Sequence, residues 1–255
     1  MKKGQMSYFF LIALIVLISS SFILYVNNNQ KAEIQPSKLS ETDYKQFANY
    51  VEECVKLSAK EAVLDTAFQG GYYNETSNSI IHSFFIIPLY SKGNSKLTPS
   101  IQKLEEQISL NADENIIRCV DDFKILKEKG FETNFEKPTS KARILPSHVL
   151  FDVTFPINVK TGSSTKSYSS FSAAIPSRYS TVYLTADKIS GLLANNPAKL
   201  CVSCLVDYAY LNELNISVVN FGKDSILITI VDDKVKIDNK NVVFNFAHSI
   251  GGLDA

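Results

Sequence analysis

The sequence predicts an α+β fold that follows an N-terminal membrane anchor. Three observations support this: an uncharged apolar run near the N-terminus, apolar residues at three- and four-residue steps after it, and period-two alternation after Gly130. Helices combined with antiparallel hairpins are typical of α+β proteins. The chain has 255 residues, of which 45% are hydrophobic and 20% charged, the composition of a folded protein.

The run Tyr8–Val26 is interrupted only by three consecutive serines. As a helix, its nineteen residues would extend roughly 29 Å, close to the ~30 Å thickness of the hydrocarbon core. Lys2 and Lys3 precede it, so the positive-inside rule predicts a cytoplasmic N-terminus. A cleaved secretory signal is the alternative, but the apolar run continues past the serines and is longer than such signals require. We therefore expect an anchor over residues 1–26, a polar linker over 27–39 and an extracytoplasmic domain over 40–255, divided into two subdomains near residue 130.

The first part of this domain reads as helix, strand, helix. Ser40 is a predicted N-cap, the apolar face running from Tyr44 to Ala62 predicts a helix, and Gly70-Gly71 predicts its end. The apolar run Ile80–Tyr90 predicts one buried strand. Thr98-Pro99 predicts the start of a second helix that continues to Val120.

The second part reads as a hairpin, two helices and a group of strands. Residues 149–159 and 168–175 alternate around a turn at Thr161-Gly162, which predicts a long hairpin with one buried face. Tyr179–Asn195 predicts a helix, and Asn196-Pro197 predicts the start of another that contains Cys201 and Cys204. We expect four strands to complete the chain, at residues 216–221, 225–231, 234–237 and 242–248, with a turn at 238–241.

The four cysteines are the most informative candidate site residues. Cys54 and Cys119 each lie on the apolar face of a predicted helix, so packing of these faces would let the two sulfurs form a disulfide, with Cys201 and Cys204 forming a second. The rival pairing joins Cys54 or Cys119 to Cys201 or Cys204. A zinc site is a weak match to this spacing, because two of the cysteines are isolated in the sequence.

The segment Cys201-Val202-Ser203-Cys204 also has the C-x-x-C spacing of thiol-disulfide oxidoreductases. Its flanking residues differ from the thioredoxin pattern, and a helix that begins at Pro197 would place Cys201 about one turn inside, where the helix dipole is weaker. We therefore favour a structural bridge and keep the redox role as the alternative.

Other chemistry is weakly indicated. The sequence contains none of the common nucleotide-binding, hydrolase, zinc-protease or calcium-binding motifs, and we expect no cofactor and no metal site. The three histidines are interpreted as hydrogen-bonded or strand-edge residues, and the acidic pairs, such as Glu52-Glu53 and Asp232-Asp233, as solvated surface. Asn74 and Asn215 begin glycosylation sequons. Because 26 basic residues balance 26 acidic ones and no basic run occurs, nucleic acid is not an expected partner.

The N-terminus carries a more specific pattern, Lys2-Lys3-Gly4-Gln5-Met6-Ser7 followed directly by the apolar run. It resembles the class III signal peptides of archaeal type IV pilin-like proteins. The resemblance implies cleavage by a prepilin peptidase between Gly4 and Gln5, with the apolar helix retained. Phe9 departs from the family pattern, which usually has a Glu there that helps align subunits in a filament. The whole chain also resembles archaeal membrane-anchored proteins with a Cys-containing helix, a Gly-Gly break and a later C-L-x-C-like element.

Together these observations predict a single-pass protein in the cell membrane, with the lipid bilayer and proteins at the cell surface as its partners. We expect a non-catalytic structural or binding role, pilin-like in its processing. The alternative is an anchored thiol-disulfide oxidoreductase that uses Cys201 and Cys204.

Overall fold

The computed structural model describes residues 41–74, 77–82, 85–162, 164–221 and 224–250. The predicted signal sequence with Gly4 and Gln5, the span Tyr8–Val26 and the linker lie outside these residues. Within the described ranges, none of the helices combines the length and apolar character needed to cross a membrane. Thr42 to Ala255 belong to one compact unit, with an α+β fold.

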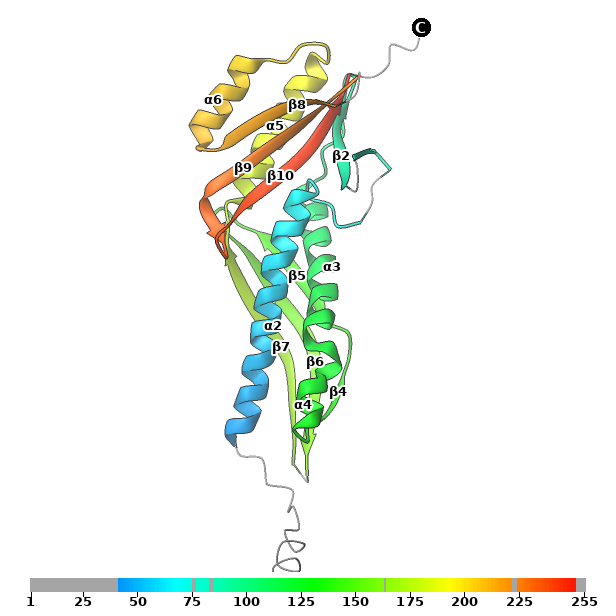
Figure 1. The fold of residues 1–255 in the computed structure, drawn as a ribbon, viewed down its shortest axis with the longest axis vertical. Helices are drawn as coiled ribbons and strands as arrows, with labels where there is room; N and C mark the ends of the chain where they lie inside the picture. The colour runs from blue at the N-terminus through cyan, green and yellow to red at the C-terminus, as the bar shows by residue number, and fades with distance from the viewer. Residues whose placement is uncertain (1–40, 75–76, 83–84, 163, 222–223, 251–255) are drawn as a thin grey trace, which may run out of the picture. The chain divides into compact units, whose positions relative to one another are not determined.

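Two long helices form the first layer (Figure 1). Helix α2 (Glu41–Phe68) ends as predicted, because Gly70 and Gly71 take positive φ values of 58° and 84° and their amides donate back to the last turn of the helix. Helix α3 (Ile101–Val120) begins after Ser100, whose hydroxyl accepts a hydrogen bond from the Lys103 amide. A 3₁₀ turn (Asp121–Phe123) and the short helix α4 (Lys124–Glu128) follow.

A four-stranded antiparallel sheet packs against these helices. It consists of β4 (Glu132–Phe135), β5 (Thr139–Ile144), β6 (His148–Thr161) and β7 (Ser164–Pro176). Strand β6 lies inside the sheet, with β4 and β5 on one side and β7 on the other. The predicted long hairpin is therefore confirmed as β6 and β7. Alternate side chains of β6 are buried, and Phe155 joins Phe123 and Phe47 in an aromatic cluster beneath α2.

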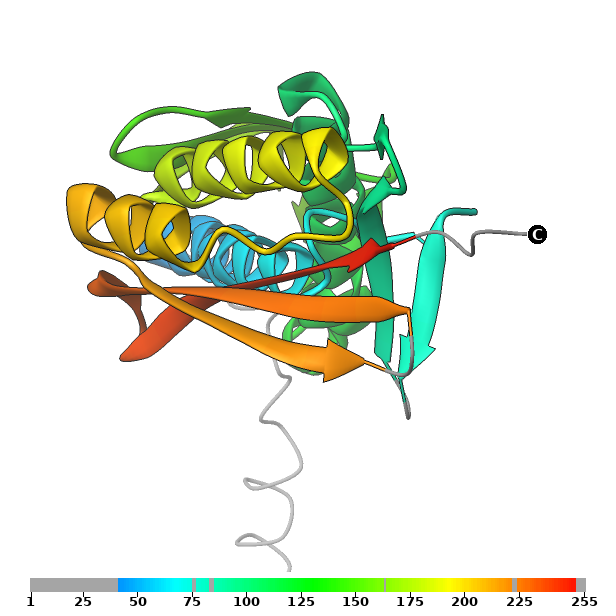
Figure 2. The ribbon, with the colours of Figure 1, turned by 90° about the horizontal axis from the view of Figure 1, so that it is seen from above.

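A six-stranded mixed sheet contains the other strands, with the order β1-β2-β10-β9-β8 and β3 paired to β2. Helix α5 (Tyr179–Asn195), which matches its prediction, contacts β2, β9 and β10, and α6 (Val202–Asn212) lies beside α5 (Figure 2). Strand β10 pairs with β2 in parallel, and the other pairs are antiparallel. The strands of this sheet are β1 (Ser79–His82), β2 (Phe85–Lys92), β3 (Ser95–Lys96), β8 (Asn215–Phe221), β9 (Ser225–Ile237) and β10 (Lys240–Ser249).

Two strand predictions were wrong in their boundaries. The run Ile80–Tyr90 is not one strand, because β1 folds back on β2 with His82 opposite Phe85, which leaves Ile81 at the sheet edge with 70% of its surface exposed. The predicted strands at 225–231 and 234–237 are one continuous strand, β9, because Asp232 pairs opposite Val242 and does not end the ladder.

Candidate functional site

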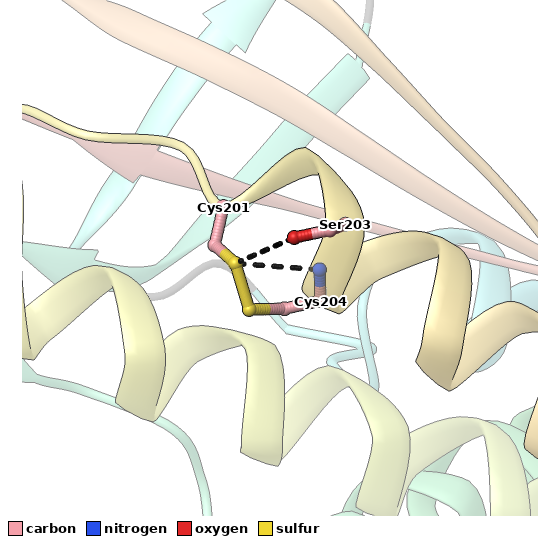
Figure 3. The surroundings of a disulfide bond; sticks show 3 residues. All are labelled: Cys201, Ser203 and Cys204. Carbon is pink, nitrogen blue, oxygen red and sulfur yellow. Dashed lines mark hydrogen bonds between the residues drawn. A yellow bond between two sulfur atoms is a disulfide. The ribbon is translucent and has the colours of Figure 1, made fainter.

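The candidate site is the Cys201–Cys204 disulfide at the beginning of α6 (Figure 3). The two Cα atoms are 5.3 Å apart. Cys201 is exposed and Cys204 is half-buried, so an incoming thiol can approach the Cys201 sulfur from solvent. This accessibility is the first requirement for thiol-disulfide exchange.

The predicted start of the helix that contains Cys201 and Cys204 was wrong. Asn196 and Pro197 end α5: the Asn196 amide donates to the Leu192 carbonyl, and proline cannot continue a helix. Helix α6 begins at Val202, with Cys201 as its N-cap. Asn196-Pro197 is therefore a stop signal of the preceding helix, and Cys201 lies at the terminus of its own helix.

The N-cap position has a chemical consequence for Cys201. Its Sγ accepts a hydrogen bond from the Cys204 amide at 3.3 Å, and the Ser203 hydroxyl lies 3.6 Å from the same sulfur (Figure 3). Amides at a helix N-terminus stabilise negative charge, and thiolates at that position are favoured. The expected weakening of the dipole at Cys201 was therefore wrong, and one argument against the redox alternative is removed.

An apolar cavity of about 430 Å³ lies between α5 and α6 and includes both cysteines in its lining. Ile189, Leu192 and Leu193 line it from α5, and Leu205 lines it from α6. Its size falls in the range of small-ligand and side-chain pockets. The disulfide thus opens onto a surface that can hold an apolar side chain.

The outer face of α6 is also apolar. Val202, Val206, Tyr210 and Leu211, here called the α6 stripe, are 62%, 61%, 82% and 73% exposed. The first three follow at four-residue steps and lie on one side of the helix. Exposed apolar residues grouped in this way are typical of interaction sites. From the sequence the same spacing would indicate a buried face, because an apolar stripe does not reveal whether a neighbour covers it.

A buried histidine positions the turn that precedes the site. Nδ1 of His248 lies 2.8 Å from the Ser91 hydroxyl, and Nε2 lies 3.1 Å from the Pro197 carbonyl oxygen. Ser91 and His248 are 0% and 1% exposed, so this pair fits the interpretation of a hydrogen-bonded core histidine. His148 contacts the hydroxyl of Ser147 at the surface. In the described part of the chain, no group of three or more His, Cys, Asp or Glu residues could hold a metal ion.

The other candidate residues lie away from α6. Cys54 and Cys119 form a disulfide between α2 and α3, with Cα atoms 5.6 Å apart, which is the pairing that the helical spacing predicts. Asn74 is exposed beyond the end of α2, and the rest of its sequon lies outside the described residues. Asn215 is exposed at the start of β8, where its side-chain amide donates to Asp233 at 3.2 Å.

Comparisons of this chain with protein-family models, with curated proteins and with solved structures found no match.

Proposed function

We propose that this chain is a single-pass, membrane-anchored extracytoplasmic protein with a non-catalytic binding role at the cell surface. The uncharged run Tyr8–Val26 and the preceding Lys2 and Lys3 support the anchor and its orientation. Two disulfides are compatible with an oxidising exterior, since disulfides persist outside the cytosol. The class III signal pattern at Gly4-Gln5 supports pilin-like processing of the same segment.

The exposed α6 stripe is the observation that carries the binding role. Four large apolar side chains on an 11-residue helix face solvent beside an apolar cavity. Burying them against an apolar segment of another extracytoplasmic protein would remove this surface from water. The binding surface proposed here is therefore the α6 stripe together with the cavity at its N-terminal end.

The test is site-specific photo-crosslinking in intact cells. A benzoylphenylalanine at Val206 should give one discrete adduct, and the adduct should be lost when Tyr210→Lys and Leu211→Lys are added. A matched probe at Val219, 59% exposed on β8, should give no such adduct. Equal adducts from both positions, or an adduct that persists with both lysines, would contradict the binding role.

The N-cap position of Cys201 favours a second candidate function, thiol-disulfide exchange with an extracytoplasmic protein dithiol. A substrate thiolate attacks the Cys201 sulfur, the bond to Cys204 breaks, and Cys204 leaves as a thiolate. The second substrate thiolate then attacks the mixed disulfide and releases the Cys201 thiolate, which the α6 N-terminus stabilises. The substrate dithiol loses two electrons and two protons and becomes a disulfide. The Cys201–Cys204 disulfide takes up these electrons and protons and becomes two thiols.

Cysteine variants separate the two candidates. Cys204→Ser leaves Cys201 as a lone thiolate, which can attack the disulfide of the oxidised substrate and release one substrate thiolate, the reverse of the second step. These mixed disulfides should accumulate until dithiothreitol releases them, because no Cys204 thiolate can displace the substrate, whereas Cys201→Ser/Cys204→Ser should trap nothing. The binding role instead predicts a Val206 crosslink that survives in the double serine variant. No trapped partner, with both cysteines fully oxidised in cells, would eliminate the exchange reaction.

A further inference from the structure

Strand β7 has one unpaired edge. Among the described strands it forms a ladder only with β6, although part of it also lies close to β9. Residues 167–175 of β7 contain no charge and no proline. Exposed edges are commonly protected by lysine, proline or a bulge, because their free amides and carbonyls attract other strands. Over these nine residues the edge of β7 has neither lysine nor proline, and the β6–β7 ladder contains one bulge, between Thr154 and Ile157 of β6.

Helix α2 forms the second wall of a groove along this edge. The groove has a volume of about 950 Å³ and is lined by residues 170–174 of β7, by residues 152–154 of β6, and by Asn49, Glu52, Glu53 and Lys56 of α2. The exposed side chains on β7 here are small, namely Ser170, Ser172 and Ala174. A second backbone can therefore approach the edge closely. A groove between an edge strand and a helix suits an added strand, whose main chain pairs with the edge.

The charge of the groove selects the partner. Glu52 and Glu53 are exposed, and in the described part of the chain neither forms an ion pair. Asp152 of β6, which also lines the groove, is paired with Arg143 at 2.9 Å. Among the described residues that line this groove, Lys56 is the one basic side chain, so the α2 wall carries a net negative charge.

We propose that the groove between α2 and β7 binds an extended basic peptide from another protein by β-strand addition. Five residues of β7 offer an edge of roughly 17 Å, enough for a peptide of similar length. The peptide's Lys or Arg side chains at alternate positions face Glu52 and Glu53, and its backbone pairs with β7. A second copy of β7 is the poorer occupant, because its uncharged segment 167–175 brings no basic side chain and would place two acidic α2 walls together.

The test uses the full-length chain in detergent micelles and a fluorescein-labelled peptide, Thr-Lys-Val-Lys-Val-Lys-Thr. Fluorescence anisotropy should show saturable binding. Glu52→Lys/Glu53→Lys should weaken binding at least about tenfold, because the complementary charge is reversed. Glu61→Lys/Glu128→Lys, an equal charge change at exposed positions outside the groove, should change affinity less than about twofold.

A second peptide tests the backbone pairing. N-methylation of both valines removes two amide donors and should abolish binding, since strand addition depends on main-chain hydrogen bonds. Equal binding of the methylated peptide would reduce the contact to charge attraction and overturn the proposal. Equal losses in the two double variants, or the absence of saturable binding, would also overturn it. A concentration-dependent dimer that the peptide does not dissociate would assign the edge to a second copy.

Discussion

Gly70 is a residue at which the fold leaves no room for a side chain. Its φ is +58°, and an added Cβ would lie 2.3 Å from the backbone oxygen of Asn245, which cannot move without disturbing β10. Gly162 has a similar φ of +56°, but nothing lies within 4 Å of its Cβ position. The two glycines therefore separate the cost of backbone conformation from the cost of a steric clash.

Alanine substitution at these two glycines should give different losses of stability. Gly162→Ala should cost about 1–2 kcal/mol, the penalty for a left-handed conformation. Gly70→Ala should cost about 1–3 kcal/mol more, because the clash is added. Urea denaturation of the two variants measures this difference, and equal losses would show that the Gly70 backbone shifts freely away from β10.

Asp113 provides a prediction of pH dependence. Burial raises the pKa of its carboxyl group, although the Ser140 amide donates to it at 2.7 Å and opposes this effect. Because the pKa of Asp113 is higher in the folded state than in the unfolded state, ionisation of its carboxyl group lowers the free energy of unfolding. This loss of stability is present above the folded-state pKa and is removed as the pH falls through it. Asp113→Asn keeps an oxygen acceptor and cannot ionise. Its melting temperature should exceed that of the wild type at pH 7, and the difference should disappear below about pH 4. A constant difference at all pH values would contradict this.

Asp232 shows the limit of reading single residues from the sequence. The pair Asp232-Asp233 was interpreted as solvated surface, but Asp232 is 0% exposed and lies 3.4 Å from the Arg178 guanidinium. Alternation along β9 turns one member of the pair inward, and the buried carboxylate requires a partner. That partner lies just before α5, far away in the sequence, so the ion pair could not be predicted from local spacing.

At the scale of elements, the two disulfides have different roles in stability. Cys54–Cys119 joins α2 to α3 across 65 residues, whereas Cys201 and Cys204 are separated by three. Cys54→Ala/Cys119→Ala should therefore lower the free energy of unfolding by about 2–5 kcal/mol, chiefly through the entropy of the unfolded chain. Cys201→Ala/Cys204→Ala should cost much less, because a short loop restrains that chain little. Denaturation of both double variants without reductant provides the measurement. A larger loss at Cys201/Cys204 would show that the α6 bridge is mainly structural.

The elements with strong local signals could be predicted from the sequence. Helices α2, α3 and α5 and the β6–β7 hairpin follow from apolar periodicity and from stops such as Gly70-Gly71. The start of α6 could not be predicted, because Asn-Pro serves both as a start and as a stop signal. The short strands β4 and β5 were missed, since their pairing with β6 comes from tertiary contacts and not from their own pattern. The α6 stripe was missed for a related reason, because exposure depends on what packs nearby.

For the whole molecule, the anchor and its processing remain predictions. Mass spectrometry of the membrane-bound protein should find Gln5 as the first residue, and Gly4→Val should block the cleavage. The expectation rests on the class III pattern Lys2–Ser7. An intact Met1 would rule out this processing but would not contradict the predicted membrane span.

Topology is tested separately. Protease added to intact cells should digest the chain beyond Asn27 and leave a small membrane fragment, because Lys2 and Lys3 hold the N-terminus inside. Permeabilised cells are the control and should lose the same region. Full protection in intact cells with digestion after permeabilisation would reverse the orientation.

The place of β10 in the larger sheet sets the order in which a newly made chain can finish folding. This last strand lies between β2 and β9, so the edge of β2 stays open until residues 240–249 have been synthesised. The sulfurs of Cys54 and Cys119 are both present long before that point. Oxidation can therefore lock the first two helices together while the sheet is still incomplete. A chain that ends before Lys240 could form the Cys54–Cys119 disulfide, but the edges of β2 and β9 that β10 normally covers would be open. Such a chain would be prone to aggregate.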